Sequence, residues 1–123
     1  MLQQIGIVAL GGALGATLRY AVSEWVSVDS FPYATLSVNL VGSFLLGVLA
    51  VGLAQNLLSA NMALLLGTGV LGAFTTMSTF SVETVQMFEQ GHGNSAIVYI
   101  AISMAFGPLL ALLGCKLGES IFV

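Results

Sequence analysis

Residues 75–81 read TTMSTFS and place five hydroxyl side chains in seven positions of an otherwise apolar stretch. Glu83 follows one turn after Thr79, and an ionisable residue at membrane depth is by default a functional candidate, although a place beside an aqueous vestibule is also open for it. Asn39 is isolated in a second apolar stretch, where a carboxamide needs either structural partners or a polar pathway. Hydroxyl and amide groups in such places indicate that the chain binds or passes an ion.

The surrounding chain is too apolar for a soluble domain. Of its 123 residues, 58% are hydrophobic and 6% are charged, whereas a soluble domain carries about 25% charged residues. Two basic residues leave no patch for a nucleic-acid backbone, so nucleic acid is excluded as a partner. No Asp, Glu, Lys or Arg occurs between Asp29 and Glu83 or within residues 93–115, which suits contact with membrane lipid.

Turn-forming and charged residues divide the chain into four apolar stretches of membrane-spanning length. We expect the spans near residues 3–23, 33–55, 62–89 and 95–118. The connections between them, near 29–32, 55–61 and 91–94, are short, which predicts one domain over residues 1–123. The first residues lack the basic side chains that open a signal peptide, so we expect a retained first span. The predicted fold class is an all-α membrane protein.

The third stretch is predicted to be a broken helix. Its apolar first part, Met62 to Gly72, covers only about 17–20 Å at a rise of 1.5 Å per residue, so a second helix over about 80–89 must complete the crossing. Backbone groups released at such a break survive in the membrane only where protein buries them or where they line an ion path.

Helical spacing aligns small or polar residues on one face of three spans. For the glycines in these stripes the simplest interpretation is close helix packing. The stripes comprise Gly11, Gly15 and Arg19; Thr35, Asn39, Ser43 and Gly47; and Tyr99, Ser103 and Gly107.

The two basic residues give no preferred orientation in the membrane. Arg19 lies toward the far end of the first span and Lys116 at the end of the fourth, so each membrane face receives one. Copies inserted both ways up could pair, which predicts an antiparallel homodimer. Arg19 could instead snorkel to the interface.

Some residues match motifs typical of enzymes, but their surroundings in the sequence do not support an enzymatic site. Residues 67–72 match G-x-G-x-x-G but lie inside an apolar span without a preceding strand. His92 is the sole histidine and Cys115 the sole cysteine, so the chain cannot form a metal site from several histidines or several cysteines. We therefore expect no enzyme activity.

Three motifs together resemble the Fluc (CrcB-type) family of fluoride channels, in the right order and over essentially the whole chain. They are GGALGATLRY at residues 11–20, VNLVGS at 38–43 and GAFTTMSTFS at 72–81. The resemblance implies a dual-topology antiparallel homodimer with two pores, in the prokaryotic cytoplasmic membrane, through which fluoride leaves the cytoplasm.

The resemblance also implies roles for single residues. The carbonyls of Gly72 and Thr75, from both subunits, would hold a buried structural sodium ion. Arg19 and Glu83 match charged positions near the pore. The pore-lining positions are matched by Asn39, Thr79, Phe80, Ser81, Tyr99 and Ser103.

Two positions depart from the family pattern. Met77 stands where the family usually has a phenylalanine that pairs with Phe80, and we expect conduction to be retained because methionine adapts its shape and its C–H groups beside sulfur can approach an anion. Gly107 stands where relatives can carry a hydroxyl, which removes a possible pore contact.

Two other classes share parts of this pattern. A small dual-topology multidrug/proton antiporter has the same length and charge balance, but it needs a carboxylate within the first span, where this chain has Arg19. A non-conducting subunit of a membrane complex would explain the glycine faces. It would not explain the hydroxyl-rich TTMSTFS segment.

Overall fold

Every regular element that the structure describes is a helix. The computed structural model describes residues 1–26 and 30–123, and Asp29 of the predicted first connection lies outside them. Four spans in this part are long and apolar enough to cross a membrane, which confirms the predicted fold class. The elements are α1 (Leu2–Trp25), α2 (Tyr33–Ala54), α3 (Ala60–Ala63), the π-helix η1 (Leu64–Leu71), α4 (Gly72–Phe74), α5 (Met77–Glu89) and α6 (Gly93–Phe122).

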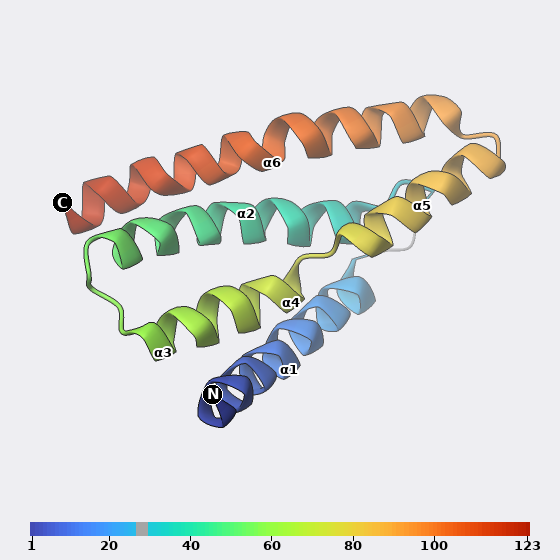
Figure 1. Cartoon of the computed structure of the whole chain (residues 1–123). Helices are drawn as coiled ribbons and strands as arrows, with labels where there is room; N and C mark the ends of the chain where they lie inside the picture. Colours follow the sequence, from blue (N-terminus) through green and yellow to red (C-terminus); the bar gives the residue numbers. More distant parts are fainter. Residues whose placement is uncertain (27–29) are drawn as a thin grey trace.

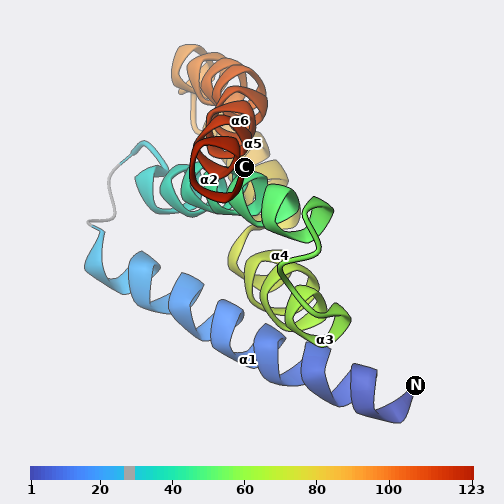
Figure 2. The same cartoon turned by 90° about the vertical axis from the view of Figure 1, so that its left-hand side faces the viewer.

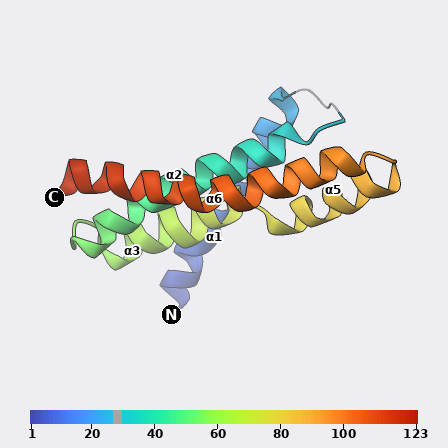
Figure 3. The same ribbon diagram turned by 90° about the horizontal axis from the view of Figure 1, so that it is seen from above.

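The helices α2 and α6 lie side by side, and the first half of the third span lies next to α2 (Figure 1). Helix α1 crosses the first half of the third span on the side away from α6 (Figure 2). Seen from above, α6 extends along nearly the whole molecule (Figure 3). Both termini and the α2–α3 connection lie toward one end, and the α5–α6 turn lies at the other.

Glycines bring the backbones of α2 and α6 together, as their predicted packing role requires. A methyl group on Gly47 would collide with the carbonyl oxygen of Ala111, and one on Gly114 would collide with that of Phe44. Lipid is as apolar as leucine, so helices in a membrane associate through such close approaches rather than through hydrophobic burial. The glycines therefore hold the α2–α6 pair together.

The third span is broken, as predicted, but its second helix begins earlier than expected. The backbone is extended at Thr75 and Thr76, with ψ angles of 157° and 118°, and α5 starts at Met77 rather than near residue 80. The cause is Thr76, whose hydroxyl accepts a hydrogen bond of 3.2 Å from the amide of Thr79 and so caps the new helix. The break is thus only two residues long.

The first half of the third span is wider than an α-helix over η1, where the amide of Gly72 donates to the carbonyl of Gly67 five residues earlier. Such π-helical segments are rare and occur frequently at functional sites. The residue pattern of 64–71 does not indicate this widening.

Candidate functional site

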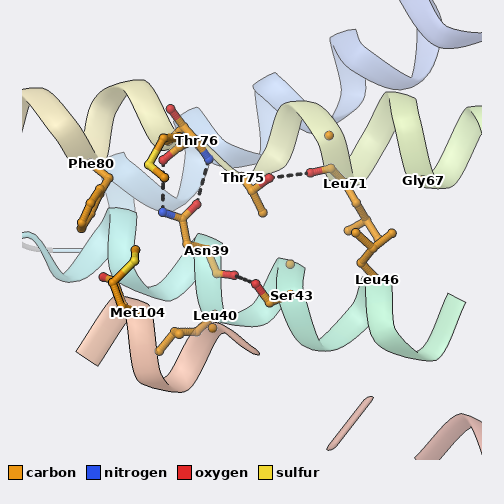
Figure 4. Close-up of a pocket in the computed structure, with 15 residues that line it drawn as sticks. Asn39, Leu40, Ser43, Leu46, Gly67, Leu71, Thr75, Thr76, Phe80 and Met104 are labelled. Atoms are coloured by element: carbon orange, nitrogen blue, oxygen red, sulfur yellow. Dashed lines mark hydrogen bonds between the residues drawn. The ribbon is translucent and has the colours of Figure 1, made fainter. Parts of the chain in front are cut away.

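The backbone N–H and C=O of Thr76 at the break are both paired with the side chain of Asn39. The Thr76 amide donates to Asn39 Oδ1 over 2.8 Å, and Asn39 Nδ2 donates to the Thr76 carbonyl over 3.1 Å (Figure 4). One carboxamide from α2 therefore satisfies both backbone groups of an extended residue, which water cannot do in hydrocarbon. Asn39 has a structural role at the break, and the second hydrogen of its amide group is not used by this pair.

The same rearrangement removes the helical donors of several carbonyl groups, among them those of Gly72 and Thr75. In a continuous α-helix the amides of Thr76 and Thr79 would donate to the carbonyls of Gly72 and Thr75. They donate instead to Asn39 Oδ1 and to Thr76 Oγ1. The oxygens of Gly72 and Thr75 are thereby released from the helical pattern, and unwound carbonyls of this kind are ligands for Na⁺ in membrane proteins. Carbonyl oxygens such as these are suitable ligands for a small hard cation.

A cavity of about 290 Å³ opens at the break, between α2, the third span and α6. Ser103 contributes a hydroxyl from α6 whose oxygen is buried and has no hydrogen-bond partner among the described residues. That hydroxyl is free to donate to a bound ion. Figure 4 shows the polar side of this cavity around Asn39, Thr75 and Thr76. Its other lining residues include Ser43, Gly72, Met77, Phe80, Met104 and Gly107.

Comparison with known proteins identifies the family. The family model described as CrcB-like protein, Camphor Resistance (CrcB), matches residues 6–115. The chain belongs to the CrcB-like family.

Relatives of the chain carry the name "Fluoride-specific ion channel FluC". The protein of Agrobacterium fabrum with this name is 43% identical over 122 residues, which cover 96% of this chain and 98% of that protein. A protein of Bacillus subtilis named "Fluoride-specific ion channel FluC 2" is 47% identical, with 93% and 86% of the two chains covered. The FluC protein of Thermus thermophilus is 43% identical, with 94% and 93% covered.

Of the pore positions carried over from the CrcB-type pattern, Asn39, Met77, Phe80 and Ser103 border the cavity at the break. Tyr99 does not border it, because its side chain is fully buried behind Phe80, with the ring centroids 4.9 Å apart. The Tyr99 hydroxyl donates to Glu83 Oε1 over 3.0 Å. Tyr99 thus supports the Phe80 ring and the Glu83 carboxylate from behind.

Thr79 and Glu83 border a second cavity, of about 410 Å³, between α5 and the segment that leads into α2. Ser81 lies on the exposed side of α5, where its hydroxyl donates to the carbonyl of Met77 over 2.9 Å. The predicted pore residues therefore fall on more than one side of α5 in a single chain.

The side chain of Arg19 reaches the break in the third span. Its Nε donates to the carbonyl of Ala73 over 3.0 Å, and the side chain is partly buried. Arg19 also borders a third cavity, of about 210 Å³, together with Thr76 and Thr79. The guanidinium of Arg19 is therefore turned toward the third span.

Two further polar residues near this CrcB-like site were given no site role by the sequence. Thr76 both caps α5 and presents its peptide group to Asn39, and its position three residues before Thr79 is the spacing of a helix N-cap. Thr35 is a buried polar residue one turn before Asn39, with 6% of its surface exposed. Its place in the α2 stripe was the available signal.

Proposed function

We propose that this chain is a passive fluoride channel of the cell membrane and not an enzyme. The observation that carries the proposal is the near full-length similarity to proteins named fluoride-specific ion channels. The cavity at the break supports it, because hydrogen-bond donors and an aromatic ring meet there within an apolar protein.

A fluoride ion is small and strongly hydrated, so a protein that admits it must replace water with donors. The candidates in this chain are the unused amide hydrogen of Asn39, the unpaired hydroxyl of Ser103 and the positive edge of the Phe80 ring. Phe80 is held in place by Tyr99, so its edge is presented at a constant position. Further along α5, the ion would meet the side chains of Thr79, Ser81 and Glu83.

The working unit would be an antiparallel homodimer with two pores. The scarcity of basic residues, with Arg19 and Lys116 the two in the sequence, supports insertion in both orientations. Exposed side chains on α5 support a second copy covering that helix, because Met77 borders the cavity and yet has 67% of its surface exposed. The partner's residues would then complete the wall of each pore.

A structural sodium ion would lie at the dimer interface, held by the carbonyls of Gly72 and Thr75 from both copies. The release of these two oxygens from helical hydrogen bonds supports this assignment. The ion would supply fixed positive charge where two broken helices meet, and it would take no part in covalent chemistry.

Efflux from proteoliposomes tests the proposal. Vesicles are loaded with potassium fluoride or potassium chloride, valinomycin is added, and anion release is recorded without a proton gradient, with protein-free vesicles as the control. We expect fluoride release and at most slow chloride release. Absence of fluoride release would refute the channel, and exchange of cationic drugs for protons would favour the antiporter.

A further inference from the structure

The face of α1 that packs on the third span ends in Arg19. A methyl group on Gly11 would collide with the carbonyl of Leu65, and one on Gly15 would collide with the carbonyl of Val70. Arg19 lies one turn beyond Gly15 on the same face, and its Nε donates to the carbonyl of Ala73 over 3.0 Å. Close backbone contact over two turns therefore fixes where the guanidinium meets the end of the half-helix.

The group that Arg19 contacts belongs to a helix end inside the membrane. The last carbonyls of a helix have no intrahelical donor and carry partial negative charge, which a cation at that end stabilises. In a continuous helix the Ala73 carbonyl would accept from the amide of Met77, which instead begins α5. Arg19 supplies the missing donor from a different span.

Ala73 lies between Gly72 and Thr75, whose carbonyls also lose their helical donors at the break. Its carbonyl is held by Arg19, and the peptide of Thr76 is held by Asn39, so α1 and α2 restrain the break from both sides. Fixing the Ala73 carbonyl limits rotation of the neighbouring peptide groups, including those of Gly72 and Thr75.

We propose that Arg19 is a positioning residue that caps the half-helix ending at Phe74 and so holds the break in its conducting shape. This role rests on the proposed channel function only where conduction is concerned. It differs from that of a charge which attracts the transported anion, because it requires a fixed hydrogen bond and is not weakened by salt.

The first test uses the unaltered chain in lipid bilayers. Arg19 is the only arginine, so labelling arginine with ¹⁵N and alanine with ¹³C at the carbonyl makes the guanidinium signal specific to one residue. We expect solid-state NMR to give a distance of about 4 Å from Arg19 Nε to an alanine carbonyl carbon, the observed contact plus one C=O bond. A guanidinium without an alanine carbonyl carbon within about 6 Å would overturn the proposal.

The second test compares Arg19→Met, Arg19→Lys and Lys116→Met. Lys116 is the matched control, because it is the other basic residue of the chain and its contact with Glu119, at 3.5 Å, is exposed. For Arg19→Met we expect amide exchange in residues 72–79 to rise at least tenfold, and fluoride flux to fall at least tenfold at both low and high salt. Arg19→Lys keeps flux within about fivefold, and Lys116→Met matches the unaltered chain in both measurements.

Two results of the second test would refute the positioning role. One is unchanged amide exchange at the break in Arg19→Met. The other is a loss of flux in that variant that disappears at high salt or at high fluoride concentration, as expected for a charge that attracts the anion. The distance and exchange measurements do not require conduction. A chain that passes no fluoride but keeps the Arg19 contact would therefore contradict the proposed function and leave the cap intact.

Discussion

At the scale of single residues, Met77 and Phe80 border the same cavity but are held differently. Phe80 packs against Tyr99 and is 8% exposed, whereas Met77 is 67% exposed. We expect the unaltered chain to conduct fluoride, and Met77→Phe to conduct within about tenfold of it, because a flexible thioether side chain can still bring C–H groups to an anion. Efflux assays on both proteins test this, with Met62→Phe as a control away from the cavity. A native protein that is inert while Met77→Phe conducts would contradict it.

Replacing Asn39 leaves the backbone N–H and C=O of Thr76 without their hydrogen-bond partner. Each unsatisfied buried group costs about 1–3 kcal/mol, so we expect Asn39→Leu to lower the free energy of unfolding by about 2–6 kcal/mol and to abolish fluoride flux. Denaturant unfolding in one detergent measures the first effect. The control is Ser43→Ala, which removes one local bond of 2.7 Å to the Asn39 carbonyl and should cost about 0.5 kcal/mol or less. Equal losses in the two variants would contradict the role given to Asn39.

At the scale of elements, the break in the third span was predictable, but the residue at which its second helix starts was not. The apolar length of Met62–Gly72 and the following hydroxyls indicate that a single helix does not cross the membrane. The restart at Met77 depends on Thr76 acting as a cap and on Asn39 from another span pairing with its peptide. The second of these is a tertiary contact, which no local pattern of the third span reports.

The fit between α1 and η1 gives an element-scale prediction. A Cβ atom on Gly15 would overlap the carbonyl of Val70, whereas one on Gly12 would meet nothing within 4 Å. We expect Gly15→Ala to destabilise the protein by about 1–3 kcal/mol through overpacking. Gly12→Ala should be neutral or should stabilise it by up to about 1 kcal/mol, because alanine favours the helix. Unfolding of the two variants in the same detergent gives the comparison, and equal stabilities would mean that α1 does not pack on η1 in this way.

At the scale of the whole molecule, hydropathy located all four spans to within a few residues, because the bilayer selects for apolar length. It did not show how each helix is rotated about its axis. Tyr99 and Ser103 share one predicted stripe, yet Tyr99 is fully buried behind Phe80 while Ser103 borders the cavity. Small rotations within a helix face decide which side chain meets a cavity, and these are set by neighbouring helices.

The last prediction concerns orientation in the membrane, which the proposed dimer requires to be mixed. Arg19 donates a hydrogen bond at the break, and Lys116 has Glu119 beside it. Little basic charge therefore remains near either membrane face to select one orientation. We expect a tag placed after Val123 to be labelled from both sides of intact cells in comparable amounts. Detection from one side only would refute dual topology.

Added charge at the two ends should then separate the orientations. Three lysines placed after Val123, or three placed in the turn at residues 90–92, should each fix one of two opposite orientations, because excess basic residues stay on the cytoplasmic side. Each variant alone should lose at least tenfold of its fluoride flux, since it lacks an oppositely inserted partner, and coexpression of the two should restore flux. A variant that is labelled from one side only and still conducts alone would show that an antiparallel partner is not required.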